Sequence, residues 1–215
     1  MKKFLMLAIV VLAVAISSSS ITRAEQPSAT PDEQASAPHV SLFTISGGTA
    51  ETLTPTSGPT PIPIGTTGYS DALLTISHTR AYKFEFLGCG DSGLDNRFYV
   101  LGFFGKLHQF DCKTSKIGDH FIANLKKINV GPHSPFHFQA AADAGGPSVF
   151  NGEGPFSGTY TNNDSWDNTS IFYAIEGSTA NPGATSGDVV LLGLSDGGAL
   201  HDNDHQDLVV RISRP

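Results

Sequence analysis

The chain has 215 residues, and its 20 Asp and Glu outnumber its 13 Lys and Arg, which gives a formal net charge of −7 at pH 7. An acidic chain repels the phosphates of nucleic acid and the headgroups of anionic membranes, so neither is an expected partner. The 23 Gly and 13 Pro fall mainly between apolar runs, where turns need them, and this favours a fold rich in strands and turns.

Residues 1–24 have the pattern of a secretory signal peptide. Lys2 and Lys3 precede an apolar run over residues 4–16, and an A-x-A-like segment ends at Ala24. The apolar run is too short for a membrane span, and no second candidate for a span follows it in the sequence. Cleavage after Ala24 would leave 10 basic and 20 acidic residues, a net charge of −10. We therefore expect a soluble product, secreted to the periplasm or the extracellular space.

The exported part divides into a linker and one domain. Residues 25–39 contain no aliphatic side chain larger than Ala, which predicts a disordered linker. Residues 40–215 are enough for a single domain with its own hydrophobic core, and no internal repeat is visible among them.

Short apolar or alternating runs, typical of β-strands, recur throughout the domain. In chain order they cover Val40–Ser46, Leu73–Ser77, Tyr82–Leu87, Arg97–Phe104, Phe121–Val130, Phe136–Ala140, Ile171–Glu176, Val189–Leu194 and Leu208–Ser213. The clearest alternation places Tyr82, Phe84 and Phe86 on one face of a strand, with Lys83 and Glu85 on the other.

About nine strands in a domain of this size predict an all-β fold, an antiparallel β-sandwich of jelly-roll type. Residues 47–68 are expected to form a loop rich in Thr, Pro and Gly. Residues 121–128 are the one stretch with a helical alternative, because Phe121, Leu125 and Ile128 would share a helix face.

The sequence contains two cysteines, Cys89 and Cys112, both in the exported part. In an oxidising compartment they are expected to form one disulfide, which closes a loop of about two dozen residues and stabilises the fold by about 3 to 3.5 kcal/mol. The alternative is two buried thiols. A metal role for the pair is disfavoured because no C-x-x-C and no nearby His pair supplies tetrahedral spacing.

The most distinctive stretch is the acidic loop between the last two expected strands. Asp196, Asp202, Asp204 and Asp207 lie within twelve residues that contain no Lys or Arg. Two carboxylates about 5 Å apart repel by roughly 3 kcal/mol at an effective dielectric near 20, so such a cluster either spreads into solvent or holds a cation. Clustered hard oxygens, with Asn203 between them, suit Ca²⁺. We therefore expect these five residues to form a Ca²⁺ site.

Two other interpretations of this loop stay open. Asp, Asn and Gly are turn formers whose side chains cap their own backbone, which would need no ion. A transition metal is the other alternative, because His201 and His205 flank the acids and neutral imidazole suits zinc or copper better than calcium. A second pair, His133 and His137, has the same i,i+4 spacing, which brings two ligands together only on a helix.

Motifs of known catalytic sites are absent from the sequence or out of context. There is no G-x-S-x-G elbow and no H-E-x-x-H. A Ser-His-Asp triad at Ser92 would need its His and Asp well before the serine, across two β-barrels, a context that this sequence does not provide. Asp91, Asp95 and Asn96 are interpreted as a turn, or as a second set of oxygens near a cation. We expect no enzyme activity.

The single tryptophan, Trp166, lies among Asn, Asp, Ser and Thr side chains in residues 162–169. An exposed aromatic among amides could stack on a sugar ring and bond its hydroxyls, which would make the chain a carbohydrate-binding module. The commoner role is a Trp that covers one end of the sandwich, and both interpretations stay open.

The two terminal segments, residues 190–198 and 202–213, resemble the C-terminal signature of uncharacterised secreted bacterial β-domains, many of which carry a PEP-type C-terminal sorting tail. The segment Asp202-Asn-Asp-His-Gln-Asp-Leu-Val-Val-Arg carries most of this resemblance. Residues 82–88 with residues 95–98 are similar to the upstream motif of these domains, and Phe136-His-Phe and Asn151-Gly152 fall where the pattern continues. The similarity spans most of residues 70–213.

The resemblance implies a secreted or surface β-domain with no known enzyme activity, whose acidic loop is a calcium site formed by the four aspartates. Two departures from the pattern matter. Gln206 stands where an acid is common, which would lower cation affinity. The chain also ends at Pro215 without a hydrophobic sorting tail, so anchoring by such a tail is not expected.

The sequence therefore predicts a secreted or surface-associated, non-catalytic β-sandwich with a Ca²⁺-binding acidic loop and a binding or structural role. The expected partner is an extracellular glycan or surface component. The alternatives are a carbohydrate-binding module that uses Trp166 and a transition-metal-dependent hydrolase that uses His201 or His205 with the neighbouring aspartates.

Overall fold

The computed structural model describes residues 40–55, 58–76, 80–90, 94–102, 105–125, 136–151, 169–177, 182–197 and 204–215. Across these residues there are fourteen strands and one short 3-10 turn, Ala142–Ala144. In the same residues, no helix has the length and apolar character needed to cross a membrane.

The strands follow from the alternation of apolar and polar side chains, most clearly in β5 (Ala81–Gly88). Tyr82, Phe84 and Phe86 are buried, and the residues between them are half-buried. Because successive side chains of a strand point to opposite faces, this pattern places one face of the strand in the core. The alternation predicted for this strand is confirmed.

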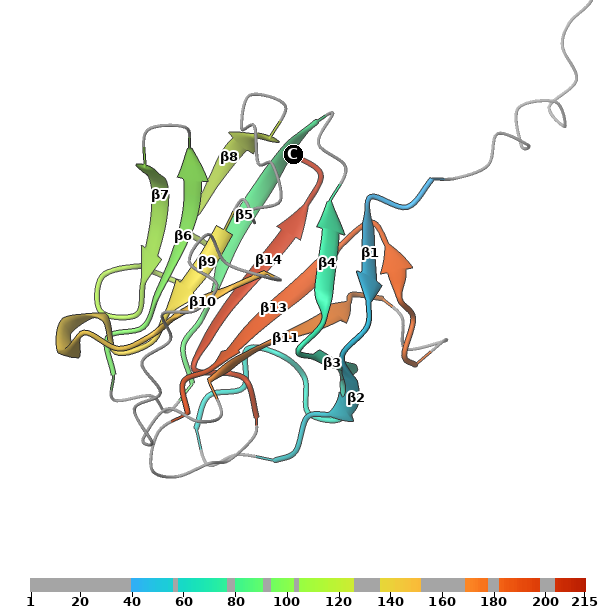
Figure 1. Ribbon diagram of the computed structural model, residues 1–215, viewed down its shortest axis with the longest axis horizontal. Helices are drawn as coiled ribbons and strands as arrows, with labels where there is room; N and C mark the ends of the chain where they lie inside the picture. The colour runs from blue at the N-terminus through green and yellow to red at the C-terminus, as the bar shows by residue number, and fades with distance from the viewer. Residues whose placement is uncertain are drawn as a thin grey trace, which may run out of the picture. The chain divides into compact units, whose positions relative to one another are not determined.

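The described strands pair into three antiparallel sheets (Figure 1). The central sheet has the order β2 (Thr49–Thr52), β3 (Thr67–Ser70), β11 (Ser170–Ile175), β13 (Val190–Ser195), β14 (Leu208–Ser213), β5 and β8 (His120–Asn124). The β6 sheet has the order β10 (Ser148–Phe150), β9 (Phe136–Gln139), β6 (Arg97–Gly102) and β7 (Gly105–Asp111). The β1 sheet has the order β12 (Ser186–Gly187), β1 (Phe43–Ser46) and β4 (Leu73–Ile76).

One face of the central sheet packs against both of the other sheets. The ring of Phe84 in β5 lies 6.0 Å from the ring of Phe98 in β6, and the ring of Phe43 in β1 lies 5.4 Å from that of Tyr82 in β5. All four side chains are fully buried, and large aromatic rings of this kind dominate the energy of a core. The predicted fold class, an antiparallel all-β sandwich, is confirmed.

The described residues contain more strands than the nine predicted, because segments without an apolar run also pair. Residues 47–68, predicted as a loop, contain β2 and the start of β3. Threonine favours strands, although it adds nothing to a hydrophobic run. Within residues 121–128, the helical alternative is wrong for the described part, because β8 extends to Asn124.

The loop between β2 and β3 covers part of the outer face of the central sheet. Leu53 and Ile62 of this loop are buried against Phe172, Leu191 and Val209. β14 is therefore buried on both faces over most of its length, rather than half-buried as its alternation predicts. The same loop reaches the segment that precedes β14, where the acidic loop ends.

Candidate functional site

The candidate site lies where strands of two sheets end. Asp196 follows β13, and Asp204 and Asp207 precede β14, the antiparallel neighbour of β13 in the central sheet. Asn96 precedes β6 of the β6 sheet, and its side chain reaches Asp196. We call Asp196, Asp204, Asp207 and Asn96 the acidic end.

The three described aspartates of the acidic loop are drawn into the fold. Asp196, Asp204 and Asp207 are 6%, 1% and 7% exposed. An acidic loop that spread into solvent would leave its carboxylates accessible to water, so that alternative is wrong for these three residues. Asp202 and Asn203, the other two predicted ligands, lie outside the described residues.

Neutral hydrogen-bond donors hold Asp196 and Asp207. The N–H of Asp196 donates to Oδ2 of Asp207 at 2.7 Å, which ties the end of β13 to the start of β14. The side-chain amide of Asn96 donates to Oδ2 of Asp196 at 3.1 Å and, at 3.5 Å, to the carbonyl of Asp207. Hydrogen bonds to an ionised carboxylate are stronger than those between neutral groups, and these fix the orientation of both side chains.

Asp204 is held on one side only. Its Oδ1 accepts a hydrogen bond from the N–H of Gln206 at 3.0 Å, the contact expected of an aspartate that caps its own turn. Its Oδ2 is buried and has no hydrogen-bond partner among the described residues. The turn-forming interpretation therefore explains one carboxylate oxygen of Asp204 and leaves the other unexplained.

The predicted five-residue Ca²⁺ site stays a prediction. Within the described ranges, no group of three or more His, Cys, Asp or Glu side chains lies close enough together to hold a metal ion. Two of the five predicted ligands, Asp202 and Asn203, fall outside those ranges. The structure does bring Asp196 and Asp207 together, through the hydrogen bond that the backbone N–H of Asp196 donates to the carboxylate of Asp207.

His205, predicted as a candidate transition-metal ligand, is held by residues outside the acidic loop. Its Nε2 lies 2.7 Å from Oε1 of Glu51 in β2, and its ring stacks on Phe172 in β11 with 5.4 Å between the ring centroids. The backbone of His205 has a φ of 51°, and its carbonyl oxygen fits against Gly193, where a Cβ would lie only 2.1 Å from that oxygen. His201 lies outside the described residues. For the part of the chain that is described, the transition-metal hypothesis gains no ligand group.

Gln206 connects the acidic end to the loop that covers the central sheet. Its Oε1 accepts from the N–H of Ile62 at 3.0 Å, and its carbonyl accepts from the N–H of Gly90 at 2.6 Å. The side chain is fully buried. The residue that departs from the resembled acidic pattern is therefore buried here, and it joins the acidic end to the loop between β2 and β3 through its side-chain oxygen.

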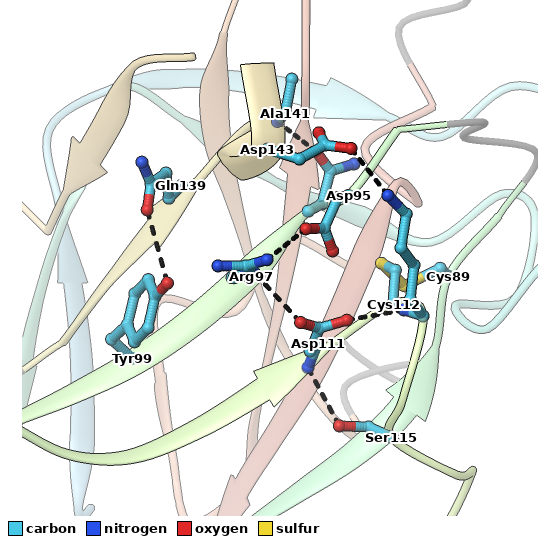
Figure 2. Close-up of polar contacts among 12 residues, drawn as sticks. Cys89, Asp95, Arg97, Tyr99, Asp111, Cys112, Ser115, Gln139, Ala141 and Asp143 are labelled. Atoms are coloured by element: carbon cyan, nitrogen blue, oxygen red, sulfur yellow. Dashed lines mark hydrogen bonds and ion pairs between the residues drawn. A yellow bond between two sulfur atoms is a disulfide. The ribbon is translucent and has the colours of Figure 1, made fainter. Parts of the chain in front are cut away.

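The predicted disulfide between Cys89 and Cys112 is present, so the alternative of two buried thiols is wrong. Cys89 follows β5 of the central sheet, and Cys112 follows β7 of the β6 sheet, so the bridge links the two sheets (Figure 2). The N–H of Cys112 donates to the carbonyl of Asn96 at 3.0 Å, and its Sγ lies 3.3 Å from the carbonyl oxygen of Asp207. The disulfide therefore lies directly beside the acidic end.

A second set of buried carboxylates lies on the β6 sheet. Figure 2 shows the guanidinium of Arg97 between Asp95, to which its Nη2 donates, and Asp111, whose Oδ2 lies 3.0 Å from its Nε. The side chains of Asp95 and Asp111 are 2% and 9% exposed, against 31% for Arg97. We call these three residues the arginine cluster. Sequence reasoning interprets Asp95 as a turn or cation ligand and misses its pairing with Arg97.

Trp166, the residue on which the carbohydrate-binding alternative depends, lies outside the described residues. Comparisons of the chain with protein-family models, with curated proteins and with solved structures find no match. The fold and the site define an antiparallel all-β sandwich with one disulfide beside a buried acidic end. Its function is therefore inferred from these residues.

Proposed function

We propose that the chain is a secreted or surface-associated, non-catalytic β-sandwich that binds Ca²⁺ at the acidic end and has a binding or structural role. Its partner in this role is an extracellular glycan or surface component. The signal-peptide pattern of residues 1–24 supports export, and the disulfide is compatible with an oxidising compartment.

The observation that carries the proposal is the unpartnered carboxylate oxygen of Asp204. This side chain is 1% exposed, and its Oδ2 has no hydrogen-bond partner within the described residues. Burying an ionised carboxylate whose hydrogen-bonding capacity is only partly met costs free energy, so one that persists needs compensation. The loop from Asp196 to Asp207 contains no Lys or Arg in its sequence that could supply it. A hard divalent cation is the compensation that such oxygens favour.

The mechanism is stabilisation by linkage. Asp196 follows β13 and Asp204 precedes β14, so an ion bound by both would hold the last two strands of the central sheet together. A cation that binds only the folded loop stabilises the fold by RT ln(1 + [L]/Kd), about 2.7 kcal/mol at a hundredfold excess over Kd. For a chain of this length, that corresponds to a rise in Tm of about 5 to 11 °C.

Thermal unfolding in EDTA and in millimolar Ca²⁺ tests the proposal. The wild type should melt about 5 to 11 °C higher in Ca²⁺, with a smaller rise in Mg²⁺, which demands a stricter geometry. Asp204→Asn keeps the Oδ1 that accepts from Gln206 but removes the charge, so it should lose most of this rise. The control is Asp143→Asn, an exposed aspartate paired with Lys113, which should keep the rise. A shift below one degree in the wild type would overturn the proposal.

A further inference from the structure

β8 is the last strand of the central sheet, and its outer edge has no partner strand among the described residues (Figure 1). The outward N–H and C=O groups of an edge strand are a template for pairing with another chain. Apolar side chains are exposed at the same place: Ile122 in β8 is 56% exposed, and Ile117, in the loop that precedes β8, is 78% exposed. The edge of the central sheet at β8 therefore combines an open strand with exposed apolar surface.

The register between β8 and β5 determines which backbone groups of β8 face outward. The N–H of Leu125 donates to the carbonyl of Arg80, so these two opposite residues form a hydrogen-bonded pair. Hydrogen-bonded and non-hydrogen-bonded pairs alternate along an antiparallel ladder. Ile122 is three positions before Leu125 and lies opposite Lys83, so it belongs to a non-hydrogen-bonded pair. Its N–H and C=O therefore point away from β5, toward the open edge.

Two other sheet edges are protected in ways that β8 is not. At β4, the N–H of Leu74 donates to Oδ1 of Asn151 at 2.8 Å, and Nδ2 of Asn151 donates to the carbonyl of Leu74 at 2.8 Å. One side chain thus takes the two hydrogen bonds that another strand would take. β2, at the opposite edge of the central sheet, carries Glu51, and a charged residue on an edge strand opposes pairing with another chain. The strand His120–Asn124 contains no Asp, Glu, Lys, Arg or Pro.

The charges around β8 suit a second copy of the chain better than a charged partner. The whole chain has a net charge of −7, so contacts between copies are in general repulsive. Beside β8, however, Lys83 and Glu85 of β5 lie 3.0 Å apart and neutralise each other. Arg211 lies 3.5 Å from the same Glu85 carboxylate and pairs with Glu176, so this network has equal numbers of basic and acidic groups. Two such edges can therefore approach without opposing like charges.

We propose that the chain forms a two-fold symmetric dimer in which β8 pairs antiparallel with β8 of a second copy. A two-fold interface brings the same surface of both chains together, so a residue on the axis faces its own copy. Ile122 is at the centre of β8, and its outward N–H and C=O exchange two hydrogen bonds with those of the second Ile122. The two exposed isoleucine side chains then cover each other, and the two central sheets become continuous. This inference does not depend on the Ca²⁺ site.

Sedimentation velocity on the full chain in EDTA, up to millimolar concentration, tests the dimer. We expect the wild type to shift from monomer to dimer as its concentration rises, because an interface formed by one edge strand is small and reversible. Ile122→Lys sets two lysines directly opposite each other and removes the apolar contact, so it should weaken dimerisation at least tenfold. The control Leu73→Lys adds the same charge at an exposed leucine of β4, the strand whose edge Asn151 blocks, and should stay within twofold of the wild type.

A single cysteine on the two-fold axis tests the register of the pairing. The two Cα atoms of a hydrogen-bonded antiparallel pair lie about 5.5 Å apart, a distance that a disulfide spans. The native cysteines are already paired with each other, so Ile122→Cys should give a disulfide-linked dimer on mild oxidation and Leu73→Cys should not. A wild type that stays monomeric at millimolar concentration would overturn the proposal. Equal cross-linking of the two cysteine variants, or a dimer that Ile122→Lys leaves intact, would overturn it as well.

Discussion

The double substitution Cys89→Ala and Cys112→Ala removes the disulfide. The expected loss of stability depends on the length of the loop that the disulfide closes. The two cysteines are 23 residues apart. In the chain-entropy account, closing a loop of this length removes about 3.4 kcal/mol of conformational freedom from the unfolded state. For a chain of about 200 residues, each kcal/mol corresponds to about 2 to 4 °C, so Tm should fall by about 7 to 14 °C.

Urea unfolding, followed by circular dichroism, measures this change directly. The loss should come with a higher m-value, because an unfolded chain without the bridge is more expanded and exposes more surface. Wild-type protein reduced with dithiothreitol should behave like the double variant. A loss of stability below about 1 kcal/mol with an unchanged m-value would refute the reasoning, since it would mean that the bridge does not constrain the unfolded state.

Three further substitutions test separate parts of the structure by the same unfolding measurement. Arg97→Met leaves two buried carboxylates without their cation and should cost about 2 kcal/mol of stability, less than the roughly 3 to 5 kcal/mol of a fully buried pair, because the guanidinium is partly exposed. The control Lys113→Met removes an exposed ion pair and should leave stability nearly unchanged. Equal losses of stability in the two variants would contradict the role given to Arg97. Gly193→Ala sets a Cβ against the carbonyl of His205 and should cost about 1 to 3 kcal/mol, so a neutral result would show that the contact is not tight. Phe98→Ala removes a ring that contacts four other buried rings and should cost about 3 to 5 kcal/mol, and a cost below about 1 would exclude it from the core between the sheets.

The fold class can be predicted from the sequence because the apolar residues of the core strands recur at the positions that are buried. β5 alternates aromatic and charged residues, and β13 is apolar from Val190 to Leu194 and is buried on both faces. β2 and β3 are not readable in this way, because Thr49–Thr52 and Thr67–Ser70 contain one aromatic and no large aliphatic side chain. The pairing of β2 with β3, and of β3 with β11, is a tertiary outcome that local composition does not encode.

Only part of the acidic end can be predicted from the sequence, for a similar reason. The aspartates of the loop are conspicuous because they lie close together in sequence, and Asp196, Asp204 and Asp207 are buried rather than spread into solvent. The contact from Asn96 joins residues 100 positions apart and exists only because two sheets pack together. No sequence spacing indicates it.

The arginine cluster likewise depends on a strand pairing that the sequence does not predict. Asp95 and Arg97 are two residues apart, so a strand-like spacing places them on one face. The pairing of Arg97 with Asp111 depends on the register between β6 and β7, in which these two residues are directly opposite. Register across a hairpin with a bulge is not given by the alternation of either strand.

Isothermal titration calorimetry with Ca²⁺ on the folded, disulfide-bonded chain tests the central claim most directly. We predict a saturating heat with one Ca²⁺ per chain for the wild type, and a titration that is flat or shifted to at least tenfold weaker affinity for Asp204→Asn. A wild type that takes up no Ca²⁺, or an Asp204→Asn variant that binds it as tightly as the wild type, would contradict the assignment of a cation to the acidic end.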